Sequence, residues 1–372
     1  MTGFLNAKLF MEEQLPDLNQ YLCHSDFEQL EAPESRVVEV FRQSHGARAL
    51  VKKKYGGLGL DAEDVLKIQL AIGSYSPSLA IASGMHQFSI ATLQSLAIGG
   101  QGLESLMLEA IAKNNLLVAS AFSEGKVGQS ILQSDIVARP EEKGVYISGT
   151  KMPCSLAQSM DLLTASVVVR PHDHRDEYFA VAMIHKDTPG LTVVPSWTAP
   201  FLRASQTESI VLDDVFVPWS MLVNVDGKQA YHAHLAGFAW FELITSVSYL
   251  GMAFGLIEKV AAMGRLEGRD KLDCFCQLES QYLALKSIAR DIDNTSESTL
   301  AESLIVRYHT QKVITDVASL ALSRVGGIHY IKDSYFATLA QVLHAFNYHP
   351  PAKHVMVEPL NTYFSGHPLK ML

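Results

Sequence analysis

Apolar residues gather in helix-length stretches through the first 117 positions, and polar turns separate them. The clearest break is the turn at residues 55–59 (YGGLG), after which residues 61–64 place acidic side chains where a helix N-terminus favours them. The pattern predicts helices over residues 65–72, 79–96 and 102–112. The chain therefore begins with a helical segment.

From residue 116 the share of β-branched residues rises, and short apolar runs alternate with turns. Turn-forming residues occupy 140–144, 171–174 and 187–190. Between them the pattern predicts seven strands, over residues 117–122, 134–139, 145–150, 162–170, 178–185, 191–195 and 209–217. Short strands at such close spacing indicate a barrel or a sandwich.

Helical periodicity returns after residue 225. It predicts long helices over residues 235–264, 278–294, 298–325 and 335–346, joined by short polar loops as in an antiparallel four-helix bundle. The expected fold class is α+β. We expect an N-terminal helical domain (1–117), a central β domain (118–223) and a C-terminal helical bundle (224–372).

Composition narrows the possible partners. The 372 residues carry a formal net charge of −9, which argues against binding to a nucleic-acid backbone. Four cysteines are too few for a disulfide framework, and Cys274 and Cys276 are too close in sequence for a usual zinc loop, so no metal is expected. The first residues lack the basic segment and cleavage site of a signal peptide, which favours a cytoplasmic protein.

One stretch, residues 235–257, is long and apolar enough to span a membrane, and Glu242 is its single acidic or basic residue. A carboxylate within a span is costly, and polar Thr245 and Ser246 weaken the membrane pattern further. We therefore expect a buried core helix and no membrane insertion. Glu242 becomes the most unusual residue of the chain.

A series of short motifs follows the same three-part order. They are YGGLG at 55–59, SEGKVGQS at 123–130, GTK at 149–151, Ala157 with Asp161, DTPGL at 187–191 and DDVFVP at 213–218. Their order and spacing resemble the acyl-CoA dehydrogenase superfamily, and the resemblance runs over nearly the whole chain.

The resemblance implies a flavoprotein whose β domain and bundle hold the isoalloxazine ring between them. Oriented backbone amides of a loop of small residues suit an anionic dinucleotide. The positions carried over from the family are Phe122 and Ser123 at the pyrimidine edge, Gly128 and Gln129 near the pyrophosphate, Pro153 against the ring, Ser155 facing N5, and Gly326 with Gly327 at the cofactor of a neighbouring subunit. It also implies a homodimer or homotetramer.

The chain departs from the family at its pyrophosphate clamp. Where most members have Arg-x-x-Phe-Gly, this chain has Arg265-Leu-Glu-Gly-Arg269. Arg265 or Arg269 could still pair with a phosphate, or either could be a solvated helix end. FAD is the expected cofactor, with FMN or no flavin as alternatives.

The position of the catalytic base also departs from the family. The usual glutamate after the last long helix is absent, and His349 lies in that stretch. A minority of members carry the base on the first long bundle helix, where this chain has Glu242, a carboxylate whose burial would raise its pKa. The alternative for Glu242 is a structural pair with an arginine or with a histidine such as His232 or His234.

His349 suggests a second branch of the superfamily, in which reduced flavin and O2 hydroxylate an aromatic ring, a sulfur or an amine. His86 and Ser123 would fit that branch as well. The favoured hypothesis is the α,β-dehydrogenation of an acyl thioester, bound to CoA or to an acyl carrier protein, with an electron-transfer partner. The alternatives are a two-component monooxygenase served by a flavin reductase, and an acyl-binding scaffold without activity.

Overall fold

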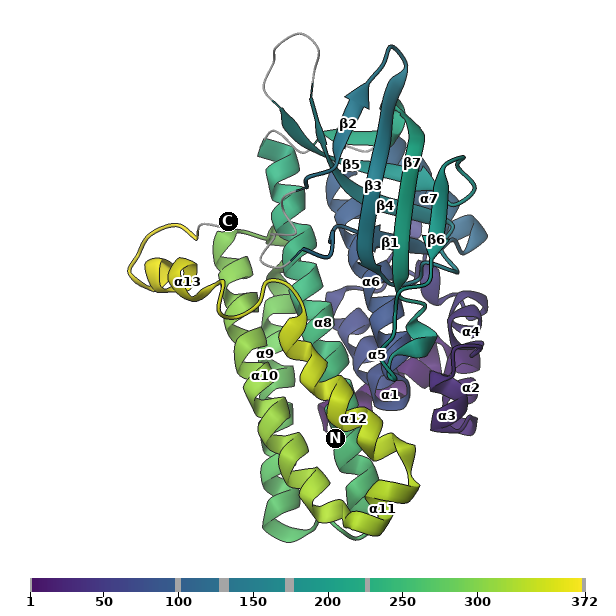
Figure 1. Cartoon of the computed structure of the whole chain (residues 1–372). Helices are drawn as coiled ribbons and strands as arrows, with labels where there is room; N and C mark the ends of the chain where they lie inside the picture. The colour runs from purple at the N-terminus through teal and green to yellow at the C-terminus, as the bar shows by residue number, and fades with distance from the viewer. Residues whose placement is uncertain (1, 98–101, 127–133, 171–176, 225–227, 370–372) are drawn as a thin grey trace.

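Helices precede and follow one β-sheet along the chain (Figure 1). The computed structural model describes residues 2–97, 102–126, 134–170, 177–224 and 228–369, with the backbone alone for 224 and 228–234. This order of elements is the one that the sequence predicts. The division into three domains remains a prediction.

The N-terminal helices enclose the first part of the core. They are α1 (Gly3–Gln14), α2 (Pro16–His24), α3 (Phe27–Glu31), α4 (Val37–Gln43), α5 (Ala62–Tyr75), α6 (Pro77–Leu96) and α7 (Leu103–Asn114). Asp61 caps α5 by accepting a hydrogen bond from the Asp64 N–H, and Ser76 caps α6 in the same way. The three helices predicted in this segment are confirmed.

The strands form a single eight-stranded sheet. They are β1 (Val118–Ala121), β2 (Val137–Pro140), β3 (Gly144–Cys154), β4 (Leu162–Val169), β5 (Tyr178–His185), β6 (Leu191–Val194), β7 (Glu208–Pro218) and β8 (Leu222–Asn224). Their order is β6-β7-β3-β2-β4-β5-β8, and β1 pairs in parallel with β4. All seven predicted strands are present. The sequence pattern missed β8, whose three residues are too few to show an alternation.

The C-terminal helices form a bundle with one projecting arm (Figure 1). They are α8 (Lys228–Ala262), α9 (Gly268–Asp291), α10 (Glu297–Val325), α11 (Gly327–Lys332), α12 (Ser334–Ala345) and α13 (Val357–Phe364). Helices α8, α9, α10 and α12 pack together, whereas α13 lies away from them. Helix α9 starts ten residues before the predicted position because its first turns are polar and carry little apolar periodicity.

Helix α8 is the centre of the molecule, and α5, α6, α9 and α10 all pack against it. The stretch Leu235–Ala262 is long and apolar enough to cross a membrane, and its most apolar window is entirely buried inside the protein. Small residues allow the close approach of α5, because a Cβ on Gly251 would lie 2.2 Å from the carbonyl oxygen of Leu70. The scarcity of charged residues over positions 235–257 of α8 thus reflects the enclosure of this stretch by other helices.

Candidate functional site

Two segments that the sequence assigns to the flavin lie side by side at one end of β3. The Met152 N–H donates to the carbonyl oxygen of Ser123 over 2.9 Å, and Glu124 forms a parallel bridge with Met152. Phe122 and Ser123 are half-buried, and Pro153 is exposed. The structure therefore places Phe122 and Ser123 beside Met152 and Pro153, and Ser155 follows two residues later in the chain. We call this group the β3 strip.

Hydroxyl groups extend the β3 strip. The Ser155 oxygen lies 2.8 Å from that of Thr207, which lies 2.7 Å from that of Ser205, and Ser205 donates its proton to the carbonyl oxygen of Leu202. With one proton on each hydroxyl, Thr207 must donate to Ser205 and Ser155 must donate to Thr207. The lone pairs of Ser155 are left to accept a hydrogen bond from another group.

A buried polar atom lies one residue away in the chain from two of these hydroxyls. The side-chain oxygen of Gln206 is buried and has no hydrogen-bond partner among the described residues. A flavin ring carries both N–H donors and carbonyl acceptors, so the free lone pairs of Ser155 suit it. Gly128 and Gln129, the residues assigned to the pyrophosphate, lie outside the described residues.

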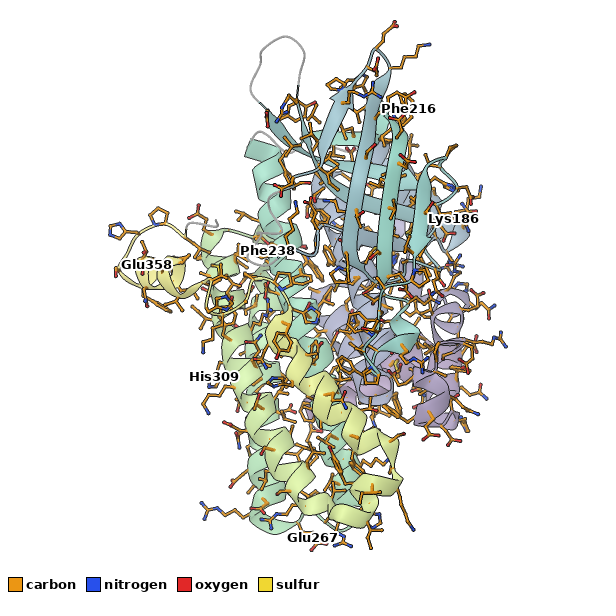
Figure 2. All side chains as sticks on the ribbon, in the orientation of Figure 1. Lys186, Phe216, Phe238, Glu267, His309 and Glu358 are labelled. Atoms are coloured by element: carbon orange, nitrogen blue, oxygen red, sulfur yellow. The ribbon has the colours of Figure 1, made fainter. Side chains whose placement is uncertain are left out.

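Three other predicted cofactor residues lie at the far end of the bundle. Arg265 is exposed between α8 and α9, and Gly326 and Gly327 join α10 to α11. A Cβ on either glycine would meet no atom of the described residues within 4 Å. Figure 2 labels Glu267 at this end of the bundle and Phe238 at the end next to the sheet. A single chain therefore does not bring Arg265, Gly326 and Gly327 to the β3 strip.

Glu242 is completely buried in the bundle and pairs with an arginine. Its Oε2 lies 2.6 Å from Nη1 of Arg307 on α10, and both side chains are 0% exposed. Its Oε1 is buried with no partner among the described residues. Burial raises the pKa of Glu242 to about 7, although the neighbouring Arg307 charge lowers it. The arginine alternative of the sequence analysis is thus present, while the side chains of His232 and His234 are not described.

Arg307 also holds the segment that contains His349. It donates to the carbonyl oxygen of Pro350 over 2.9 Å and to that of His349. Nε2 of His349 lies 2.9 Å from the hydroxyl oxygen of Tyr249. Burial lowers the pKa of His349 to about 3, helped by the nearby Arg307 charge, so the imidazole is neutral. Glu242, Tyr249, Arg307 and His349 are called the bundle cluster below.

The sequence analysis missed Arg307 and Tyr249. A signal for Arg307 is its position on the apolar stripe of α10, where it follows Leu300 and Leu304 at helical spacing. A charged residue on a core-facing stripe needs a buried partner. The identity of that partner, 65 positions earlier, cannot be derived from spacing.

His86 is engaged on both ring nitrogens. Its Nε2 lies 2.7 Å from the carbonyl oxygen of Ala47, and its Nδ1 accepts a hydrogen bond from the Val118 N–H over 3.0 Å. Burial lowers the pKa of His86 to about 4. This ring is a neutral link between α6 and β1, and neither nitrogen is left to donate a proton to a flavin.

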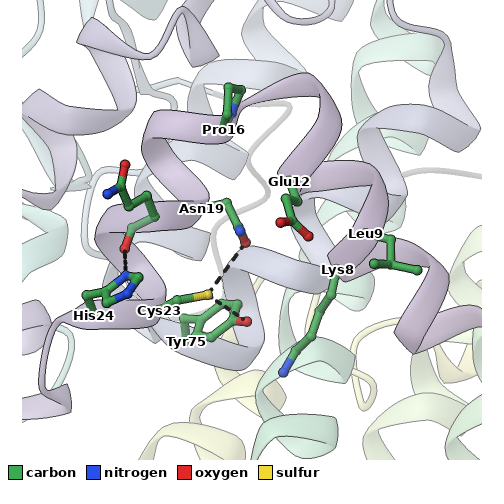
Figure 3. Close-up of a pocket in the computed structure, with 9 residues that line it drawn as sticks. Lys8, Leu9, Glu12, Pro16, Asn19, Cys23, His24 and Tyr75 are labelled. Atoms are coloured by element: carbon green, nitrogen blue, oxygen red, sulfur yellow. Dashed lines mark hydrogen bonds between the residues drawn. The ribbon is translucent and has the colours of Figure 1, made fainter.

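A groove between α1, α2 and the end of α5 is separate from the β3 strip and from the bundle cluster (Figure 3). It contains Lys8, Glu12 and Cys23, whose sulfur lies 3.2 Å from the hydroxyl oxygen of Tyr75. Of the predicted cofactor residues that the structure describes, none lines this groove. Glu358, which lies beyond His349 in sequence, is exposed on α13 (Figure 2).

Known proteins resemble the chain over most of its length, although no protein-family model matches it. It is 36% identical to an isobutylamine N-hydroxylase of Streptomyces viridifaciens over 92% of both chains. It is 25% identical to an L-prolyl-[peptidyl-carrier protein] dehydrogenase of Serratia over 57% of this chain and 55% of the relative. It is 24% identical to the mitochondrial isovaleryl-CoA dehydrogenase of Oryza sativa over 78% and 72%.

Solved structures share the fold. KijD3, in a complex with FMN and dTDP-3-amino-2,3,6-trideoxy-4-keto-3-methyl-D-glucose, superimposes with a TM-score of 0.81 at 21% identity. The match covers 98% of this chain and 96% of KijD3.

Proposed function

The chain belongs to the acyl-CoA dehydrogenase superfamily of flavoproteins, and from that premise we propose that it hydroxylates the nitrogen of a primary amine with reduced flavin and O2. The proposal is supported by the extent of the likeness to an amine N-hydroxylase, which covers 92% of both chains. It adopts the monooxygenase alternative of the sequence analysis in place of the favoured dehydrogenase.

The observation that carries the proposal is the ion pair between Glu242 and Arg307. Dehydrogenation of a thioester needs a carboxylate that can remove the α-proton of the substrate. The turn at 346–351 has no carboxylate, and Glu242 is enclosed and bound to Arg307 at 2.6 Å. Oxygenation of an amine nitrogen needs no carbon base, so the bundle cluster can be entirely structural.

Reduced flavin would supply the two electrons that, with two protons, convert one oxygen atom of O2 to water while the other forms the N–O bond. The β3 strip would supply the contacts for such a ring. Ser155 donates its proton to Thr207 and so presents acceptor lone pairs, which suits the N–H that position 5 of a flavin carries only when reduced. Placed at position 5, as the resemblance implies, Ser155 would therefore favour the reduced form.

A separate flavin reductase is the expected partner. The chain lacks the Phe-Gly part of the motif that clamps the pyrophosphate in most members, and Arg265 is exposed in the single chain. Without that clamp, FMN and FAD should bind with similar affinity, and the flavin should exchange with solution. Both properties suit a protein that receives reduced flavin from another enzyme.

A turnover assay tests the proposal. The protein is incubated with isobutylamine, NADH, a flavin reductase, FMN and catalase, and the N-hydroxylamine is measured by mass spectrometry. We expect the hydroxylamine with the parent and with Glu242→Gln, which keeps the shape of the carboxylate but leaves the Arg307 charge unpaired and is therefore first shown by circular dichroism to be folded. We expect a large loss with Ser155→Ala. Absence of hydroxylamine across a panel of primary amines, with reduced flavin bound, would contradict the proposal.

Dehydrogenation of a carrier-protein-bound acyl group is the second candidate. It is favoured by the Oε1 atom of Glu242, which has no partner among the described residues, and by the raised pKa of that carboxyl. Under this alternative the protein would reduce an artificial electron acceptor with an acyl or prolyl thioester, and Glu242→Gln would abolish the reaction. If neither reduced nor oxidised flavin binds, the scaffold alternative gains support.

A further inference from the structure

A buried lysine lies directly behind the β3 strip. Lys151 is in β3, next to the exposed Met152, and its side chain is 0% exposed. Successive side chains of a strand point to opposite faces, so Lys151 faces inward where Met152 faces outward. A lysine is rarely buried in full unless acceptors surround its ammonium group.

The ammonium of Lys151 has three described partners from three parts of the chain. Nζ lies 2.8 Å from Oε1 of Glu124, 2.9 Å from the hydroxyl of Ser166 on β4, and 3.2 Å from the hydroxyl of Ser134. The side chain of Glu124 is only 2% exposed. Lys151, Glu124, Ser134 and Ser166 are called the lysine cluster.

The lysine cluster reaches the backbone of the predicted flavin contacts. Ser166 donates its proton to the carbonyl oxygen of Phe122 over 3.3 Å, while Glu124 directly follows Ser123 in the chain. Lys151 therefore holds the segment 122–124 at both ends, directly through Glu124 and indirectly through Ser166. The bond from Met152 to Ser123 fixes the middle of the same segment to β3.

The cluster also joins the two described ends that flank residues 127–133. Glu124 precedes them and Ser134 follows, and the Ser134 hydroxyl donates to Oε1 of Glu124 over 2.6 Å. The Asp135 N–H lies 3.2 Å from each oxygen of Glu124. The positive charge of Lys151 stabilises the Glu124 carboxylate, which also accepts the hydrogen bonds from Ser134 and from the Asp135 N–H.

We propose that Lys151 is a positioning residue for the flavin, which holds segment 122–124 against β3 so that a bound ring meets preformed partners. Its ammonium would not touch the flavin. The inference depends on flavin binding and holds for both candidate reactions, so its test does not need turnover.

Flavin affinity measured by equilibrium dialysis tests this role. The affinities of the parent protein for oxidised and dithionite-reduced FMN and FAD are measured first. The flavin form that binds the parent most tightly is then used for every variant. Ser166→Ala cuts the link to Phe122 without changing the charge, and we expect an affinity about threefold weaker with an almost unchanged melting temperature of the apoprotein. For Lys151→Met we expect an affinity at least about tenfold weaker.

Two further variants separate positioning from folding. Lys151→Met combined with Glu124→Gln removes both buried charges, and we expect it to regain thermal stability while flavin affinity stays low. Lys186→Met changes an exposed lysine of the same sheet region (Figure 2) and should leave affinity unchanged. Parental affinity in both Ser166→Ala and the double variant would overturn the proposal, even if Lys151→Met alone fails to fold.

Discussion

Buried polar residues of this chain act as links between elements that are distant in sequence. Arg307 joins α8, α10 and the turn at 349–350, while Lys151 joins β3 to β4. Arg307 and Lys151 each form a buried ion pair, with Glu242 and with Glu124. Removing one member of a buried ion pair leaves the other charge unpaired, and the loss in unfolding free energy is larger than the net contribution of the pair. These links are therefore where single substitutions should have the largest effects on stability.

Arg307→Met is expected to lower the free energy of unfolding by about 3–5 kcal/mol, because Glu242 would be left buried without its partner. Urea unfolding followed by circular dichroism measures the change. Lys312→Met is the matched control on the same helix, since its pair with Asp316 is exposed and should contribute less than about 1 kcal/mol. Equal effects of the two substitutions would contradict this account of the bundle cluster.

The buried histidines predict how stability depends on pH. Burial lowers the pKa of His86 in the folded protein to about 4. As the pH falls, the unfolded chain therefore binds a proton at this histidine before the folded protein does. The free energy of unfolding that is present above the unfolded pKa of histidine is consequently lost towards acid pH. From about pH 7.5 to about pH 5 this histidine should remove about 2 kcal/mol of unfolding free energy.

Urea unfolding of the parent and of His86→Gln at these two pH values checks the prediction. The variant should show the smaller pH dependence. The comparison between variants is needed because the raised pKa of Glu242 acts with the opposite sign, so that its contribution to stability falls as pH rises towards 7. An identical pH dependence in the two proteins would show that His86 is not neutral in the folded state.

At the scale of elements, the crossing of α5 and α8 depends on glycines. Gly251→Ala would place a methyl group 2.2 Å from the backbone oxygen of Leu70, and a backbone atom cannot move aside as a flexible side chain can. We expect a loss of about 1–3 kcal/mol in unfolding free energy. Gly327→Ala is the control, because no atom in the described part of the chain lies within 4 Å of its added Cβ.

Thermal unfolding of both glycine variants measures this difference. A melting temperature of Gly251→Ala equal to that of the parent would mean that α5 and α8 lie farther apart than the structure shows. A comparable loss in Gly327→Ala would point to contacts made outside the single chain.

The sequence predicts elements better than contacts. The seven longer strands and the main helices follow from periodicity and turn residues, because these signals are local. Strand β8 was missed because it is short. The pairing of Glu242 with Arg307, and the exclusion of His86 from any proton transfer, depend on residues far apart in the chain. Local patterns do not contain that information.

At the scale of the whole molecule, the predicted cofactor residues divide into two groups. The β3 strip lies beside the sheet, whereas the turn from α8 to α9, which contains Arg265, and the start of α11 at Gly326 and Gly327 lie at the opposite end of the bundle (Figure 1). If both groups contact one flavin, they must come from different chains. The homodimer or homotetramer implied by the sequence stays a prediction, and this division supports it.

Sedimentation velocity tests that prediction. We expect at least a dimer, and we expect Gly327→Arg to weaken flavin binding although the substituted position is remote from Ser155 in its own chain. A monomer that binds flavin with the affinity of the parent, or a Gly327→Arg variant with unchanged affinity, would contradict the shared site.

The central claim is oxygen transfer from O2 to an amine nitrogen, and isotope incorporation tests it most directly. The protein, reduced flavin and isobutylamine are incubated under ¹⁸O₂, and the product is analysed by mass spectrometry. The account predicts an N-hydroxylamine that carries one ¹⁸O atom, in the parent and in Glu242→Gln. A product without label, or an unsaturated thioester formed without O2 in a reaction that Glu242→Gln abolishes, would contradict it.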